Sequence, residues 1–156
     1  MKKYIEIKAN LCSGCRICEM VCSLHKFNEF NPFGSGIIII SEDNKGVDIP
    51  ALCRQCRNPA CVKVCPAERV FKQIPDFEPP IYRDTQTGII WLDSKKEYCL
   101  GCNECMRACP FGAIRLNLEE QQLVKCDLCG GHPECVEFCP TGAIKLVDFR
   151  SPRAEI

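Results

Sequence analysis

The sequence has no long hydrophobic run. Its longest aliphatic stretch covers only residues 37–40, whereas a helix that crosses a membrane needs about 20 apolar residues. Two lysines follow the first methionine, but Glu6 and Lys8 interrupt the segment behind them. This region therefore lacks the apolar stretch of a secretory signal peptide. We expect a cytoplasmic protein that does not span a membrane.

The sequence also has no net charge. Its 20 basic and 20 acidic residues cancel, so the polypeptide has no overall field that would attract nucleic acid or an acidic membrane surface. It contains no nucleotide-binding glycine loop and no evident acid/base pair. We therefore expect no nucleic-acid partner, no membrane partner and no catalytic residues.

Cysteine is the residue that the sequence has in excess, with 16 among 156 residues. Such a content is typical of either a disulfide scaffold or a metal protein. In the reducing cytosol that we expect for this chain, structural disulfides are disfavoured and clustered cysteines indicate metal.

The cysteines fall into four runs of four, with none left over. The first run is Cys12-x2-Cys15-x2-Cys18-x3-Cys22, and the third is Cys99-x2-Cys102-x2-Cys105-x3-Cys109-Pro110. The other two lengthen only the middle gap: Cys53-x2-Cys56-x4-Cys61-x3-Cys65-Pro66 and Cys126-x2-Cys129-x5-Cys135-x3-Cys139-Pro140. The third run matches the bacterial ferredoxin pattern.

This spacing suits a 4Fe-4S cubane. A tight loop with cysteine at every third position can direct three thiolates at three iron corners of one cluster, and the cysteine after x3 can reach a neighbouring cluster. The proline that follows ends the turn, because it has no N–H to donate. The 16 cysteines therefore predict four 4Fe-4S clusters, tied together by crossed ligation. Bound clusters would bring the net charge to about −8.

Zinc is the main alternative, because Cys-x2-Cys pairs also build tetrahedral zinc sites. Zinc ribbons need two such pairs, whereas each run here adds a cysteine after x3. A radical enzyme would need Cys-x3-Cys-x2-Cys, and the positions that would complete this motif hold His25, Glu68, Gly112 and Gly142. We therefore favour cubanes over a structural zinc module and exclude the radical motif.

Short strands are expected between the runs. Residues 109–116 and 139–146 share the pattern Cys-Pro-x-Gly-Ala-Ile-x-Leu, an internal repeat in which the glycine suits a left-handed turn and Ala-Ile-x-Leu predicts a strand. Further strands are expected at 4–9, 36–41, 89–93 and 123–125, with a Thr87-Gly88 hairpin turn after 81–83 and an irregular loop at 74–80. With strands this short, the clusters are expected to form most of the core.

Seven polar residues near the runs have less specific interpretations. The two histidines, His25 and His132, are expected to make ordinary hydrogen bonds. Five basic residues either raise cluster potentials or are solvated surface charges, and both interpretations stay open: Arg16, Arg54, Arg57, Arg107 and Lys125.

The first run, in its setting, is more specific than a single ferredoxin motif. Residues 12–25 read CSGCRICEMVCSLH, followed by EFNP at 29–32 and by Ser35. Over nearly the whole chain, the sequence resembles the four-cluster electron-transfer subunits of the dimethyl sulfoxide reductase type. It looks most like the small iron–sulfur subunit of tungsten-dependent aldehyde oxidoreductases. Similar short members serve carbon monoxide dehydrogenase and benzoyl-CoA reductase.

The resemblance implies an α+β, ferredoxin-like fold with short strands and short helices. It implies a single polyferredoxin domain, 1–156, built from two pseudo-symmetric two-cluster modules. The outer module contains runs 12–22 and 126–139, and the inner module contains runs 53–65 and 99–109. In a linear arrangement we expect clusters two and three to lie in the middle.

The resemblance also implies the ligands, because in that family the first run pairs with the fourth and the second with the third. Cluster one then takes Cys12, Cys15, Cys18 and Cys139, and cluster four takes Cys126, Cys129, Cys135 and Cys22. Cluster two takes Cys53, Cys56, Cys61 and Cys109, and cluster three takes Cys99, Cys102, Cys105 and Cys65. Run one has Ser23 where the other runs have proline, which leaves its last turn open.

The predicted function is single-electron transfer by a non-catalytic subunit of an anaerobic oxidoreductase. Its partners would be a larger catalytic subunit with a tungsten or molybdenum pterin and a further redox subunit. The alternatives are a free, diffusible polyferredoxin, the equivalent subunit of carbon monoxide dehydrogenase or benzoyl-CoA reductase, and a structural zinc module. Co-purification with a larger subunit separates the first two, and metal analysis excludes the last.

Overall fold

The computed structural model describes residues 2–42 and 44–148 as a set of short helices and strands. The α-helices are α1 Ile17–Phe27, α2 Ala60–Val64, α3 Ala67–Phe71, α4 Glu104–Arg107 and α5 Glu134–Glu137, and the 3-10 helices are η1 Ala9–Leu11, η2 Pro32–Gly34 and η3 Leu128–Gly131. The strands are β1 Lys3–Ile7, β2 Ile37–Glu42, β3 Val47–Leu52, β4 Ile81–Arg83, β5 Ile90–Leu92, β6 Ile114–Asn117, β7 Gln122–Lys125 and β8 Ile144–Asp148. The predicted α+β class with short elements is confirmed.

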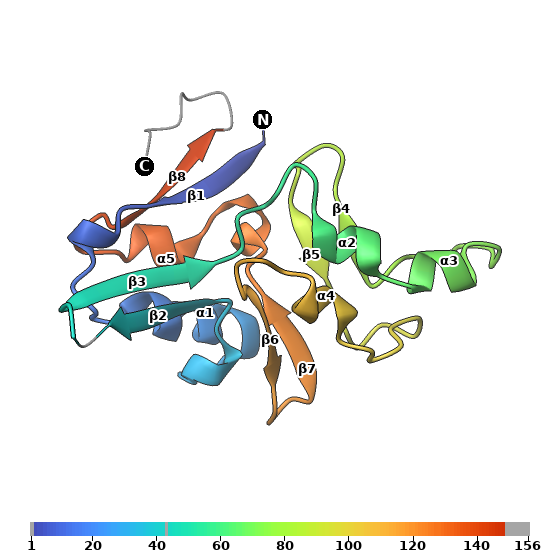
Figure 1. The fold of residues 1–156 in the computed structure, drawn as a ribbon, viewed down its shortest axis with the longest axis horizontal. Helices are drawn as coiled ribbons and strands as arrows, with labels where there is room; N and C mark the ends of the chain where they lie inside the picture. Colours follow the sequence, from blue (N-terminus) through green and yellow to red (C-terminus); the bar gives the residue numbers. More distant parts are fainter. Residues whose placement is uncertain (1, 43, 149–156) are drawn as a thin grey trace.

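The strands pair as antiparallel two-stranded ribbons, β1–β8, β2–β3, β4–β5 and β6–β7 (Figure 1). The β1–β8 ribbon joins the two ends of the described chain, with Ile5 opposite Leu146 and Ile7 opposite Ile144. A two-stranded ribbon is at best marginally stable in water. Each ribbon therefore depends on what packs against it.

Most of the predicted strands are confirmed. β6 and β8 follow the repeated Cys-Pro-x-Gly turn, and Gly112 and Gly142 have the expected left-handed φ values of +57° and +65°. The 81–83 hairpin is present, and residues 74–80 contain neither helix nor strand. The strand expected at 4–9 ends at Ile7, because Ala9 begins η1.

β3 is a strand that the sequence pattern did not indicate. It contains Pro50, which argues against a central strand, because proline cannot donate to a ladder. Pro50 lies opposite Ile39 in a ribbon of only two strands. Each strand of such a ribbon has a free edge, and proline is tolerated on an edge strand.

Ser23 explains why α1 is the longest helix among the described residues. α2, α4 and α5 have four or five residues and end before the Cys-Pro step of their runs. α1 has 11 residues and continues through Cys22 to Phe27. The Ser23 hydroxyl is buried; it donates to Met20 O at 2.9 Å and accepts the Asn31 N–H at 3.1 Å. The missing proline therefore lengthens the helix.

Cysteine and isoleucine share the buried interior. Seven cysteines are buried: Cys18, Cys22, Cys53, Cys61, Cys105, Cys126 and Cys135. One buried group contains Ile5, Ile37 and Ile39 with cysteines of runs one, two and four, and a second contains Ile81, Ile90 and Ile114 with Cys61 and Cys105. In Figure 1, α1, α5, β1, β2, β3 and β8 form one half, α2, α3, α4, β4 and β5 form the other, and β6 and β7 lie between them. No helix of the described chain is long and apolar enough to cross a bilayer.

Candidate metal centres

Each cysteine run is a tight loop that leads into a helix. The residue before the second cysteine has a left-handed backbone in all four runs, with φ of +67° at Gly14, +47° at Gln55, +62° at Gly101 and +57° at Leu128. Such a residue turns the chain sharply. The third cysteine of every run then lies on the following helix and is buried: Cys18, Cys61, Cys105 and Cys135.

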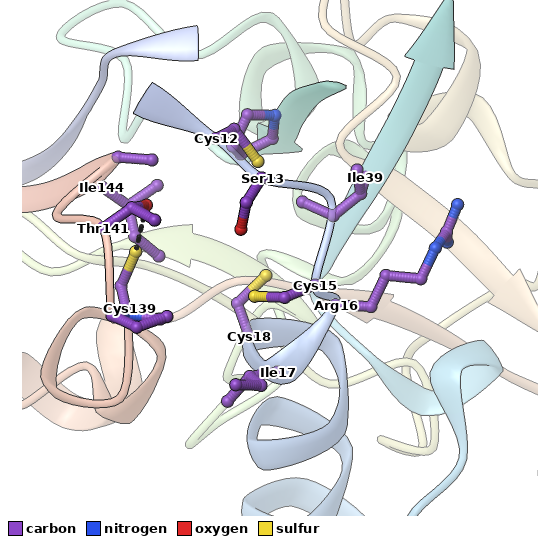
Figure 2. A pocket seen from close by; sticks show the side chains of 13 residues that line it. Cys12, Ser13, Cys15, Arg16, Ile17, Cys18, Ile39, Cys139, Thr141 and Ile144 are labelled. Atoms are coloured by element: carbon purple, nitrogen blue, oxygen red, sulfur yellow. Dashed lines mark hydrogen bonds between the residues drawn. The ribbon is translucent and has the colours of Figure 1, made fainter. Parts of the chain in front are cut away.

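Cys12, Cys15, Cys18 and Cys139 line one pocket. In Figure 2, the first three come from the loop ahead of α1 and from its first turn, and Cys139 approaches from the segment that follows α5. Ile39 and Ile144 complete an apolar wall. The structure thus brings together, from opposite ends of the chain, the four cysteines expected for cluster one.

A second pocket is lined by the four cysteines expected for cluster three. Cys99, Cys102 and Cys105 come from the third run, and Cys65 comes from the end of the second run. Ile81, Leu92 and Leu123 form apolar parts of its wall. Two runs again contribute three cysteines and one cysteine to a single space.

The thiols expected for cluster four lie close enough to affect one another. Burial raises the pKa of the Cys135 thiol far above its ordinary value, and Cys126, Cys22 and Cys129 raise it further. Burial also raises the pKa of Cys129, and Cys22 adds to that rise. Cys22 of the first run therefore belongs, in space, with three cysteines of the fourth.

The same is true of the thiols expected for cluster two. Burial raises the pKa of Cys61 to about 11, with further contributions from Cys53 and Cys109. At Cys56, burial is the largest cause of the raised pKa, followed by Cys53 and then by Cys109. Cys109, the last cysteine of the third run, therefore lies with cysteines of the second.

The four groups of cysteines follow one another in the order one, four, two, three. Cys18 raises the pKa of Cys135, although burial is the largest cause, which places group one beside group four. Cys53 likewise adds to the effect of burial on the pKa of Cys126, which places group four beside group two. Cys61 and Cys105 share one buried cluster, which joins group two to group three. This order differs from our expectation, because groups four and two are central.

Backbone N–H groups point at several sulfur atoms. Gly36 N–H donates to Cys22 Sγ at 3.2 Å, and Ala113 N–H donates to Cys109 Sγ at 3.4 Å. At Cys139, burial raises the pKa, but hydrogen bonds led by the Ile144 N–H and the Thr141 hydroxyl bring it below its ordinary value. Such donors stabilise negative charge on sulfur and tune iron–sulfur sites.

The donor set fits cubanes. Within the described ranges, no three histidine, cysteine, aspartate or glutamate side chains gather tightly enough to hold a single metal ion. A cubane does not require several ligands around a single ion, because each of its four irons takes one thiolate. Groups of four sulfurs around a pocket, with backbone N–H donors, are the arrangement that it requires.

Two buried polar residues beside the cysteines were not anticipated. Glu19 is 1% exposed, accepts the Ile39 N–H at 2.6 Å and pairs with Arg16 at 3.2 Å. Gln55 is fully buried and bridges Ile90 to Cys126. Their only signal in the sequence is their position inside a run.

The expectation for His25 is confirmed, since its Nδ1 lies 2.7 Å from Glu134 Oε1. This contact joins α1 to α5. Arg107 is exposed and lies 2.5 Å from Glu104, and Arg54 lies over the Phe111 ring at 5.8 Å. Lys125, in contrast, is buried.

Two family models match the chain. Residues 45–149 match the 4Fe-4S dicluster domain, and residues 9–27 match a 4Fe-4S binding domain. The chain belongs to the 4Fe-4S ferredoxin-type iron–sulfur proteins. The predicted iron–sulfur class is thereby confirmed, and the zinc module is not supported.

The sequence relatives of this iron–sulfur protein include subunits of reductases. It is 31% identical over 121 residues to a tetrathionate reductase subunit of Salmonella typhimurium, an alignment that covers 74% of this chain and 43% of the relative. It is 35% identical over 125 residues to the polyferredoxin-like subunit of an aliphatic sulfonate oxidoreductase of Pyrococcus furiosus, with 80% of this chain and 64% of the relative covered. The aligned part of the chain thus spans less than two thirds of the length of either relative.

A solved structure has a similar fold. The active-site complex BamBC of benzoyl-coenzyme A reductase, bound to benzoyl-CoA, contains a chain that aligns with a TM-score of 0.51 at 20% identity. The alignment covers 93% of this iron–sulfur protein and 78% of that chain. At this identity, the likeness concerns the fold.

Proposed function

We propose that this protein is the electron-transfer subunit of an oxidoreductase complex and performs no bond chemistry of its own. The observation that carries the proposal is that four cysteine groups follow one another across both halves of the molecule, each adjacent to the next. A series of redox sites is useful where two distant partners must exchange electrons. A free ferredoxin needs only one or two clusters.

The proposed ligand sets are those that the resemblance implies. Cluster one is held by Cys12, Cys15, Cys18 and Cys139, and cluster four by Cys126, Cys129, Cys135 and Cys22. Cluster two is held by Cys53, Cys56, Cys61 and Cys109, and cluster three by Cys99, Cys102, Cys105 and Cys65. When bound, each cluster accepts or donates one electron at a time. The proximity of these cysteines and the two pockets support the sets.

The proposed architecture is a single domain with two two-cluster modules. Runs 12–22 and 126–139 form one, and runs 53–65 and 99–109 form the other. The two buried groups of cysteine and isoleucine support this division, because Cys18, Cys22, Cys126 and Cys135 belong to the first and Cys61 and Cys105 to the second. Cys53 also belongs to the first group, at the junction.

The proposed partner is a larger catalytic subunit with a tungsten or molybdenum pterin, of the aldehyde oxidoreductase type, in a cytoplasmic complex with a further redox protein. The first run and its EFNP continuation support this class by resemblance. Relatives named as reductase and oxidoreductase subunits support a catalytic partner. The BamBC likeness keeps a benzoyl-CoA reductase complex as a second candidate.

The test is anaerobic purification of a tagged chain from its native host, followed by identification of what accompanies it and by metal analysis. We expect a larger subunit with tungsten or molybdenum, and about sixteen iron and sixteen sulfide per chain for four cubanes. Recovery of the fully loaded chain alone would favour a free polyferredoxin. About half that iron, or stoichiometric zinc, would refute the four-cluster assignment.

A further inference from the structure

Lys125 places a buried positive charge between two groups of cysteines. It is the last residue of β7, directly precedes Cys126 and is 4% exposed. Its ammonium donates to the backbone carbonyl oxygens of Ile90 and of Cys126, the latter at 2.5 Å. Both acceptors are neutral. They satisfy two donors of the ammonium but leave its charge unbalanced.

The ion pairs of the described residues do not include Lys125. Lys26 provides the contrast, because its amine lies 2.6 Å from Asp127 Oδ2. Asp127, the carboxylate two residues after Lys125, is therefore already paired with another cation.

Lys125 lies next to ligands of two different groups. It directly precedes Cys126 in the chain, and Ile90, whose carbonyl oxygen accepts from its ammonium, shares one buried cluster with Cys61. Cys126 belongs to group four and Cys61 to group two, the two central groups. A buried charge is costly unless opposite charge lies nearby. Thiolates bound to iron on both sides would supply that charge.

We propose that the fixed positive charge of Lys125 favours the reduced state of the two central clusters, two and four. The proposal rests on the ligand sets given under the proposed function. Reduction adds one electron and no proton, so the net charge of a site becomes one unit more negative. A nearby cation stabilises that state more than the oxidised one and so raises the potential.

The arginines within runs one and three, which supply most ligands of the outer groups, differ from Lys125 in burial and in pairing. Arg16, which follows Cys15, and Arg107, two residues after Cys105, have side chains that are 51% and 65% exposed. Both are also paired with glutamates, Glu19 and Glu104. Solvent and the paired carboxylates screen these charges. The buried charge of Lys125 is screened much less.

Gln55 offers a matched neutral control. Its amide donates to Cys126 O at 2.9 Å and accepts the Ile90 N–H at 2.8 Å. Gln55 and Lys125 therefore join the same two residues, and only Lys125 is charged. A purely structural clamp between Ile90 and Cys126 would be weakened by substitution of either side chain. An electrostatic effect would be lost only with Lys125.

The test is a redox titration of the anaerobically purified holoprotein, followed by EPR spectroscopy, in Lys125→Met, Lys125→Gln, Lys125→Arg and Gln55→Leu. The two neutral Lys125 variants should lower the midpoint potentials of two of the four clusters by ~59 mV or more, which corresponds to a tenfold or larger change in a one-electron reduction equilibrium. Lys125→Arg should retain the wild-type potentials. Gln55→Leu should shift them less than Lys125→Met does. Double variants identify the shifted clusters. Cys15→Ser, added to a neutral Lys125 variant, should alter the signal of cluster one, and Cys102→Ser that of cluster three. Neither should alter the two signals whose potentials have shifted.

Unchanged potentials in both neutral variants, or an equal shift in Gln55→Leu, would overturn the role of Lys125 and leave electron transfer intact. If both neutral variants fail to load clusters two and four while Lys125→Arg loads them, the charge serves assembly, and the proposal is equally overturned. A wild-type protein that lacks four clusters would instead refute the proposed function.

Discussion

At the scale of single residues, the cysteine groups tolerate little extra volume around them. Gly36 is the clearest case, because its N–H reaches Cys22 Sγ and its Cα faces the backbone of run four. A Cβ at this position would lie 2.8 Å from Cys126 N and 3.0 Å from Cys126 Cα. Glycine is therefore required here for close approach of two backbones, not for an unusual φ.

Gly36→Ala is expected to destabilise the protein by about 1–3 kcal/mol, as overpacking of a buried site does. The new methyl group must push Cys126 away, so the EPR signal of cluster four should weaken more than that of cluster three. The control is Gly46→Ala, where φ is +62° but nothing lies within 4 Å of the added Cβ. That variant should show backbone strain alone, with all cluster signals retained. Equal cluster loss in both variants would contradict the steric argument.

At the scale of the elements, α1 ties the first run to the fourth. Its last turn makes two contacts with run four: Lys26 Nζ lies 2.6 Å from Asp127 Oδ2, and His25 Nδ1 lies 2.7 Å from Glu134 Oε1. These contacts exist only because the helix continues past Cys22. The serine that replaces proline in the first run therefore has a structural consequence.

Ser23→Pro is expected to cost about 3 kcal/mol or more, because proline in a helix interior removes a hydrogen bond and clashes with the carbonyl four residues earlier. The contacts of Lys26 and His25 with run four should be lost as well. Ser23→Ala is the matched control; it keeps the helix and loses the hydroxyl contacts to Met20 and Asn31, at about 1–3 kcal/mol. Chemical denaturation of both loaded variants measures the difference. A proline variant as stable as the alanine variant would show that the length of α1 is unimportant.

Crossed ligation between runs gives a second prediction at this scale. Cys22→Ala should impair the cluster proposed for Cys126, Cys129 and Cys135, and should leave the cluster of the first run intact. The physical reason is that Cys22 lies with the thiols of run four. Burial is the largest cause of the raised pKa values of Cys135 and Cys129, and Cys22 raises them further. EPR spectroscopy and iron content of the variant decide the matter. Loss of the first-run cluster instead would mean that each run ligates its own cluster.

At the scale of the whole molecule, the sequence predicts local features better than long-range ones. The cysteine runs, the Cys-Pro-x-Gly turns and the strands after them follow from neighbouring residues, so β6, β8 and the 81–83 hairpin could be predicted. β3 could not, because Pro50 is tolerated only through the free edge of its ribbon. The burial of Glu19 and Gln55 and the central place of group four depend on contacts between distant segments. Periodicity and spacing do not report such contacts.

The last prediction concerns removal of the metal. Strands of three to six residues and helices of mostly four or five residues bury little apolar surface without the cysteines between them. The thiols also favour the protonated form in the folded chain: burial raises the pKa of Cys18 and of Cys126 from 9.0 to about 12. Iron must displace those protons, so cluster binding and folding are coupled.

Anaerobic chelation of the iron is therefore expected to abolish the cooperative unfolding transition, as followed by circular dichroism and by sensitivity to protease. Refolding with iron and sulfide should restore it and release protons, and the yield should fall as the pH is lowered from about 9 toward 6, because protons compete with iron for the thiolates. Zinc supplied in place of iron serves as the control and should not restore the transition, since a single ion cannot span four sulfurs placed for a cubane. A metal-free chain that still unfolds cooperatively would show that the isoleucine clusters suffice as a core without the clusters.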